Sequence, residues 1–132
     1  MSEEFKIEIV NPEKSFLSKD DVIETVIPAF EGEMGILKDH ISIISFLKPG
    51  IIKVFTGSEE EKFYVEDGIV EFKDNNLSIL TSHIFDLKNV NKEEISSSIS
   101  NTEKELLKDD LDDQKKFLLN HKIEVLKSIN IS

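Results

Sequence analysis

"AFEGEMGILKDHISIISFLKPG", residues 29–50, is the segment on which the interpretation of the fold depends. It combines acidic side chains with a histidine, ends in the turn sequence Lys48-Pro49-Gly50 and leads into a strand pattern at residues 51–55. Gly32 and Gly35 permit a positive φ or a close backbone approach, and Pro-Gly is typical of a tight turn. We therefore expect a shaped loop that displays acids with apolar residues between them.

Short strand patterns lie on both sides of this segment. In the expected strand at residues 5–10, Phe5, Ile7 and Ile9 alternate with Lys6 and Glu8, and a β-branched run at residues 22–27 stops at Pro28. The other expected strands are residues 35–37, 41–47, 51–55, 62–66, 69–72 and 77–80. Turn residues separate them, and we interpret the three glutamates at 59–61 as a solvated hairpin tip. Many short strands at this spacing predict an antiparallel β-sandwich over residues 1–88.

The pattern changes after residue 88. Asn91 and Glu94 have the spacing of a capping box, which marks the start of a helix, and Val90 and Ile95 have the spacing of a hydrophobic staple. The apolar face of this helix is expected to hold Ile95, Ile99, Thr102 and Leu106. A second helix is expected to begin at residues 109–113, where aspartates suit a cap and a first turn. Its apolar face is expected to hold Leu111, Leu118, Val125 and Ile129, widened by Leu119, Ile123 and Leu126.

No glycine or proline separates the two helices, so one continuous helix is an alternative. Two antiparallel helices, each about 25 Å long at ~1.5 Å per residue, are favoured. The predicted fold class is therefore α+β, with an antiparallel β-sandwich over residues 1–88 and an antiparallel helical hairpin over residues 89–132.

The composition excludes several classes of function. A net charge of -11 opposes binding to nucleic acid or to an anionic membrane surface. All sixteen basic residues are lysine, so no guanidinium clamp on phosphate is available, and no cysteine can form a disulfide or a thiolate site. The acidic start lacks the features of a signal peptide, and no apolar run is long enough to cross a bilayer. We expect a cytoplasmic protein without direct lipid insertion.

Two chemical alternatives arise from the acids of the opening segment. Glu31 and Glu33 could act as a carboxyl pair, since a retaining glycosidase needs two carboxyls about 5 Å apart, but such close neighbours are typical of solvated loop acids. Glu33, Asp39 and His40 could bind a metal ion, but no second histidine lies nearby in the sequence. Walker, nucleophile-elbow and dinucleotide motifs are absent from the sequence. We expect no catalytic residue, no metal site and no cofactor.

Four motifs occur in order along the chain: VNPEKSFLS at residues 10–18, PxxEGExGILxxH at 28–40, KPG at 48–50 and DGIVE at 67–71. With the helical hairpin that follows, this set resembles the epsilon subunit of bacterial F-type ATP synthases. The chain departs from the family at residues 39–42, where Asp-His-Ile-Ser stands in place of Gly-His-x-Pro. It also lacks the arginines that ATP-binding members carry at the start of the hairpin, so we expect no ATP binding.

The resemblance implies a non-catalytic rotor subunit that couples proton translocation to ATP synthesis and can restrain ATP hydrolysis. Its implied partners are the gamma subunit, the polar loops of the c ring and, through the hairpin, the alpha/beta catalytic head. The implied location is peripheral, at the cytoplasmic face of the inner (plasma) membrane. The c-ring loop would hold Glu31, Gly32, Glu33, Gly35 and His40, and the basic contacts of the hairpin would be Lys104, Lys108, Lys115, Lys116 and Lys122. The alternatives are a free-standing β-sandwich that binds a ligand and dimerises through its hairpin, and a metal-dependent enzyme on a β scaffold.

Overall fold

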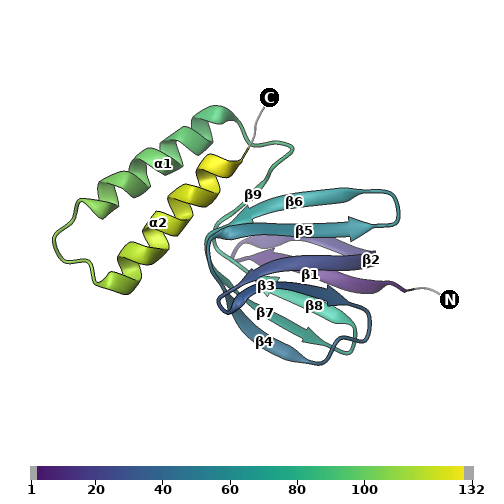
Figure 1. Cartoon of the computed structure of the whole chain (residues 1–132). Coiled ribbons are helices and arrows are strands. Elements are labelled where there is room, and N and C mark those ends of the chain that lie inside the picture. Colours follow the sequence, from purple (N-terminus) through teal and green to yellow (C-terminus); the bar gives the residue numbers. More distant parts are fainter. Residues whose placement is uncertain (1–2, 130–132) are drawn as a thin grey trace. The chain divides into compact units, whose positions relative to one another are not determined.

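The structure is a computed structural model, and it describes residues 3–129 (Figure 1). Met1 and Ser2, which begin the acidic N-terminal segment, and residues 130–132, at the end of the predicted hairpin, lie outside the described residues. The chain divides into two compact units, Met1–Leu87 and Lys88–Ser132, which are described separately.

The first unit is a β-sandwich, as predicted. Its strands are β1 (Phe5–Asn11), β2 (Lys14–Ala29), β3 (Gly32–Leu37), β4 (Ile43–Leu47), β5 (Gly50–Thr56), β6 (Glu60–Val65), β7 (Gly68–Lys73), β8 (Asn76–Leu80) and β9 (Ile84–Asp86). Hydrogen bonds connect them in the order β1-β8-β7-β4-β2-β5-β6-β9, and β3 pairs with β2. All of these pairs are antiparallel except β1 with β8, which is parallel.

Strand β2 is longer than the predicted run at residues 22–27. Its first part pairs with β1 and its second part with β3 and β5, so one strand belongs to both layers of the sandwich. The first part was missed because register shifts interrupt the β1–β2 ladder and disturb the alternation of side chains. The predicted stop at Pro28 is also wrong. Pro28 lacks an N–H, but its carbonyl still accepts a hydrogen bond from Lys48 N at 3.0 Å, and the strand continues to Ala29.

The three glutamates at 59–61 do not form a hairpin tip together. The turn closes with a hydrogen bond from Thr56 N to Glu59 O at 2.9 Å, and β6 already begins at Glu60. Glu61 is largely buried and forms an ion pair with Lys19 of β2. The short strand β9, which pairs with β6, was not predicted.

The core of the sandwich is apolar and includes aromatic contacts. Phe5 meets Phe72 edge to face with ring centroids 5.6 Å apart, and Phe16 meets Phe63 in the same way at 5.6 Å. The buried core residues are Phe5, Ile7, Ile9, Val22, Ile27, Ala29, Ile36, Leu47, Ile52, Val54, Phe63, Val65, Val70, Phe72, Leu77 and Ile79. All nine strands but β9 contribute to this list, so each predicted strand has a face in the core.

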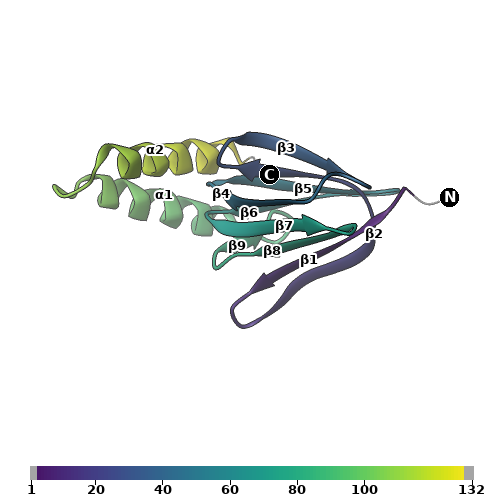
Figure 2. The ribbon, with the colours of Figure 1, turned by 90° about the horizontal axis from the view of Figure 1, so that it is seen from below.

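The second unit is a helical hairpin of α1 (Lys92–Leu106) and α2 (Asp113–Ser128), which lie side by side in both views (Figures 1 and 2). The predicted capping box is present, because Asn91 accepts a hydrogen bond from Glu94 N at 2.8 Å. Asp112 caps α2 and accepts from Lys115 N at 2.7 Å. The alternative of one continuous helix is therefore wrong, since this second cap starts a new helix without a glycine or proline.

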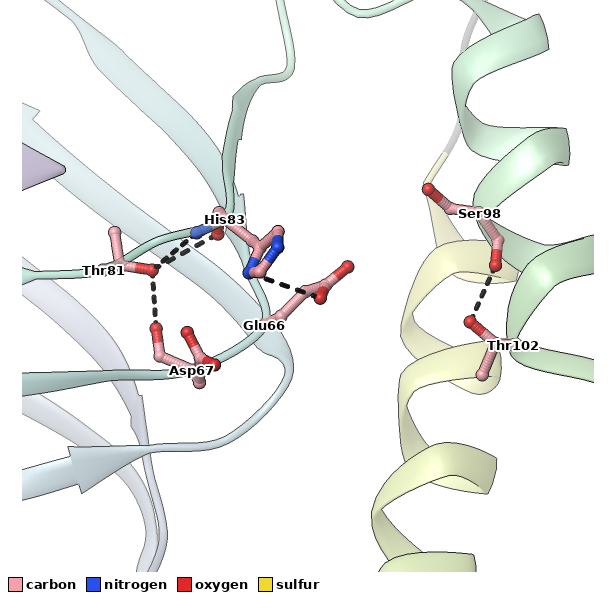
Figure 3. A network of polar contacts seen from close by, with 6 residues as sticks. All are labelled: Glu66, Asp67, Thr81, His83, Ser98 and Thr102. Atoms are coloured by element: carbon pink, nitrogen blue, oxygen red, sulfur yellow. Dashed lines mark hydrogen bonds and ion pairs between the residues drawn. The ribbon is translucent and has the colours of Figure 1, made fainter. Parts of the chain in front are cut away.

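The buried residues of the hairpin are Ile95 and Thr102 on α1, and Leu119, Ile123 and Leu126 on α2. On α2 the residues expected to widen the face are thus its centre, while Leu118 and Val125 are only partly buried. The Thr102 hydroxyl is satisfied, because it donates to Ser98 O at 2.7 Å (Figure 3). Within residues 3–129, neither helix is long and apolar enough to span a membrane.

Candidate docking surfaces

Two acids of the opening segment, Glu31 and Glu33, lie at one end of the sandwich. Phe30 and Glu31 form the turn between β2 and β3, and Phe30 N donates to Phe46 O at 2.9 Å. Gly32 has a φ of +137°, a conformation that side chains rarely adopt, so the glycine is required by the turn. Glu33 follows in β3, opposite Pro28, and its side chain is exposed. Glu31, Gly32 and Glu33 are called the acidic tip below.

A buried serine contacts the acidic tip. Ser45 Oγ lies 3.0 Å from both carboxylate oxygens of Glu31, and its side chain is only 6% exposed. Ser45 occupies a core-facing position of β4, between Ile43 and Leu47. The sequence analysis missed this residue, although a hydroxyl at a core-facing strand position needs a hydrogen-bond partner.

His40 does not lie in the same loop as the acidic tip, which corrects the sequence interpretation. Strand β3, six residues long, separates the turn at Glu31 from His40, a span of about 20 Å at ~3.3 Å per residue. His40 stacks edge to face on Phe72 with ring centroids 6.0 Å apart, and its Nδ1 lies 2.8 Å from Ile41 O. Residues 31–40 are close in sequence, but a complete strand carries the chain from one end of the sandwich to the other between them.

The end that holds His40 is closed by paired side chains. Asp39 N donates to Asn75 Oδ1 at 2.7 Å, and Asn75 Nδ2 donates to Asp39 Oδ1 at 3.0 Å. Both residues have positive φ, with values of +66° for Asp39 and +60° for Asn75. The departure from Gly-His-x-Pro therefore places an aspartate in a left-handed conformation, which the contact with Asn75 stabilises.

Gly35 lies in the middle of β3, away from both turns. Its φ is not positive and it lies in a strand, so of the two expected reasons for a glycine the positive φ does not apply at this position. A methyl group on Gly35 would lie 3.2 Å from Glu24 Oε2, so the glycine leaves room for that carboxylate.

A polar network connects two other loops at the acidic end (Figure 3). The buried Thr81 hydroxyl donates to Asp67 O at 2.6 Å and accepts from His83 N at 3.3 Å. His83 Nδ1 lies 3.8 Å from Glu66 Oε2. The network fixes the β6–β7 turn against the connection from β8 to β9.

An exposed apolar surface lies beside the acidic tip, and the sequence analysis did not identify it. Phe46, Ile69 and Leu80 stand opposite one another on β4, β7 and β8, with exposed fractions of 60%, 45% and 50%. Phe30, in the turn, is 45% exposed. Together these four residues are called the outer apolar face, and with Pro12, Leu47, Asp67, Gly68, Thr81 and Ser82 they line an open groove of about 400 Å³. Exposed apolar side chains gathered in this way are typical of a surface that another protein covers.

The five lysines predicted to make basic contacts lie at four places along the hairpin. Lys104 is in the last turn of α1, Lys108 is in the connection, Lys115 and Lys116 are in the first turns of α2, and Lys122 is near the middle of α2. All are exposed except Lys122, which is half-buried. Four of the five therefore lie at the connecting end of the hairpin, where they can contact an acidic surface.

The alternative of a metal site gains no geometric support. Within the described part of the chain, no three histidine, cysteine, aspartate or glutamate residues lie close enough to hold a metal ion. The Glu31 carboxylate is oriented by Ser45, and the site offers a carboxylate on a fixed turn beside apolar side chains. Such an arrangement suits contact with a protein surface.

The chain is thus an α+β protein, in which a small β-sandwich that carries the outer apolar face is followed by a two-helix hairpin. The family model of the ATP synthase delta/epsilon chain β-sandwich domain matches residues 4–86, and the chain belongs to this family. The ATP synthase epsilon chain of Pelagibacter ubique is 67% identical over 130 residues, which cover 98% of this chain and all of that relative. The epsilon chain of Rhizobium etli is 35% identical, over 80% of this chain and 78% of its own length.

Solved structures share the fold at low sequence identity. A chain in the Euglena gracilis mitochondrial ATP synthase (OSCP/F1/c-ring) matches 96% of this chain and 79% of its own length, with a TM-score of 0.73 and 18% identity. A chain in the Tetrahymena thermophila mitochondrial ATP synthase (central stalk/c-ring) matches 96% of both chains, with a TM-score of 0.71 and 19% identity. Both matches extend beyond the sandwich into the hairpin, since the sandwich ends at Leu87.

Proposed function

We propose that the chain is a non-catalytic subunit of the central stalk of a proton-translocating ATP synthase and turns with the rotor. The observation that carries this proposal is the match to the Pelagibacter ubique epsilon chain along its whole length. One structural neighbour belongs to an OSCP/F1/c-ring assembly and the other to a central stalk/c-ring assembly. The proposal places the chain peripherally, at the cytoplasmic face of the inner (plasma) membrane.

The outer apolar face is proposed to bind the gamma subunit. Its three strand residues and Phe30 form one surface of exposed large side chains, and aromatic residues are enriched at the centres of protein interfaces. The groove next to this face offers a concave surface for a partner side chain. Binding of a partner to this face would remove its apolar side chains from water, which favours association, and would require no change in the fold.

The acidic tip is proposed to contact the polar loops of the c ring. Glu31, in the turn, and Glu33, in the first residues of β3, are both exposed, and Gly32 and two backbone hydrogen bonds hold the turn in shape. His40 is not included in this contact, because β3 separates it from the tip. Gly35 is assigned a role in strand packing only.

Two sets of variants test these contacts. Phe46→Ser and Ile69→Ser should each weaken co-purification with the gamma subunit, by about tenfold for a residue near the centre of the interface. Ile41→Ser is the matched control, since Ile41 is 76% exposed and lies in the connection next to His40. Unchanged retention of gamma by both serine variants would contradict the assignment.

Charge reversal tests the acidic tip. Glu31→Lys with Glu33→Lys should weaken binding to the c ring by about 1–2 kcal/mol and lower the coupling of proton flow to ATP synthesis in reconstituted membranes. The control is Glu60→Lys, an exposed acid at the start of β6, which pairs with Phe55 of β5 and lies outside both the acidic tip and the outer apolar face. Coupling that stays at the native level in the tip variant would remove these residues from the interface.

The hairpin is proposed to restrain ATP hydrolysis through contacts of Lys104, Lys108, Lys115, Lys116 and Lys122 with acids of the catalytic head. A lysine contributes a point charge rather than a bidentate fork, so the inhibition should be modest and should weaken with salt. ATP should not control the hairpin, because a ligand shifts a two-state equilibrium only through a difference in affinity and the chain lacks an arginine clamp. Truncation after Asn89 should raise the ATPase rate of the complex, and isothermal titration of the isolated chain with ATP should show no micromolar binding.

A further inference from the structure

Ser45 is a core-facing residue with a polar contact at the surface. In β4, Ile43, Ser45 and Leu47 face the interior, whereas Ile44 and Phe46 face outward. A hydroxyl at such a position is costly unless it is hydrogen-bonded. The Ser45 hydroxyl lies 3.0 Å from each Glu31 oxygen and 3.5 Å from Phe46 O, so the carboxylate is its principal partner.

The contact fixes an exposed charged side chain. A serine hydroxyl carries one proton, which the two carboxylate oxygens of Glu31 share, and a hydrogen bond to an ionised acceptor is stronger than a neutral one. The backbone of the turn is held as well, by Phe30 N to Phe46 O at 2.9 Å and by Lys48 N to Pro28 O at 3.0 Å. A glutamate on a turn without such a partner samples several rotamers, whereas the contact with Ser45 favours the rotamer that brings this carboxylate to the serine.

We infer that Ser45 is a positioning residue for docking: it holds the Glu31 carboxylate in the orientation that receives a cationic side chain of the neighbouring subunit. This inference rests on the proposed contact of the acidic tip. A group that is ordered before binding loses less conformational freedom when the complex forms, so Ser45 acts on affinity through pre-organisation. The remaining acceptor sites of the carboxylate are free to take the partner's N–H donors.

The test compares Ser45→Ala, Ser45→Thr and Glu31→Gln in the full chain. Binding kinetics are measured on liposomes that contain the ATP synthase depleted of this subunit. Ser45→Ala should raise the dissociation rate about three- to tenfold, the scale of ordering one side chain. The association rate should not change, because the charge remains and long-range attraction sets that rate. Ser45→Thr, which keeps the hydroxyl, should behave like the native chain.

Glu31→Gln should slow association as well as speed dissociation, and Ser45→Ala should add nothing in the Glu31→Gln background. Urea unfolding of each variant reports the purely structural effect. One outcome refutes the positioning role but leaves the docking proposal in place. In that outcome, Ser45→Ala lowers the urea midpoint without changing binding, whereas Glu31→Gln weakens binding. If Ser45→Ala changes the dissociation rate equally in the native and the Glu31→Gln backgrounds, the positioning role is also refuted. If Glu31→Gln binds like the native chain, the docking of Glu31 itself is refuted.

Discussion

The buried hydroxyl of Thr25 offers a sharp test of how polar groups determine the stability of the sandwich. Thr25 lies in β2 opposite Ile36 of β3 and Val54 of β5, and all three side chains are fully buried. Its Oγ1 has no hydrogen-bond partner among the described residues. Thr25→Val keeps the shape of the side chain, removes the unsatisfied hydroxyl and places a methyl group in apolar surroundings.

The expected gain follows from the cost of an unpaired buried polar group, about 1–3 kcal/mol. We expect the free energy of unfolding to rise by about 1–2 kcal/mol, with the urea midpoint higher by roughly 0.5–1 M and the slope unchanged. The melting temperature should rise by about 4–8 °C per kcal/mol for a domain of this size. Circular dichroism at increasing urea, on the full chain, provides the measurement.

Thr81→Val is the matched control in the same sandwich. Thr81 is also buried, but its hydroxyl donates to Asp67 O at 2.6 Å and accepts from His83 N, so the same substitution breaks two bonds. Thr81→Val should lower the free energy of unfolding by about 1–3 kcal/mol. If both valine variants lower the urea midpoint, the Thr25 hydroxyl is satisfied in solution and the reasoning is refuted.

Three further predictions concern other parts of the sandwich. Gly68→Ala should lower the free energy of unfolding by at least about 2 kcal/mol, because φ is +151° and the new methyl group would lie 2.6 Å from Leu80 O; Gly57→Ala, with an ordinary φ and 3.9 Å of clearance to Ile23, is the control for urea unfolding, and equal midpoints would contradict the clash. Burial, with the charges of Glu66 and Asp67, raises the pKa of Tyr64, so the folded state holds the phenol proton more tightly and stability should be complete below about pH 10 and fall as the pH rises further. Tyr64→Phe should remove this alkaline loss, and the tyrosinate absorbance of the chain's single tyrosine reports the titration directly; a Tyr64 that titrates normally in the folded state would show the prediction to be wrong. A fragment of residues 1–88 should unfold cooperatively by circular dichroism, since its core is supplied by its own strands, and an unstructured fragment would show that the hairpin is required.

The fold could be predicted from the sequence where one face of an element is apolar. Residues 5–9 alternate apolar and charged side chains and lie in β1, and the capping box at Asn91 marked the start of α1. The first part of β2 could not be predicted in this way, since residues 14–21 are largely polar and register shifts displace them relative to β1. Backbone hydrogen bonds stabilise this part of the strand, and its register is irregular. Its sequence therefore shows no alternation of apolar and polar side chains with a period of two.

The candidate site was harder to predict, because it depends on which ends of strands meet. Glu31 and His40 are nine positions apart but lie at opposite ends of β3, whereas Glu31 and Ser45 are fourteen positions apart and share a hydrogen bond. Two signals in residues 43–47 do point to the surface. A serine takes a core-facing position, which requires a nearby polar partner, and apolar residues fill both faces of the strand, although a half-exposed strand needs only one. A strand that is apolar on both faces suits cover on both, and Phe46 is 60% exposed in the part of the chain that the structure describes, so we propose a neighbouring subunit as the cover of this face.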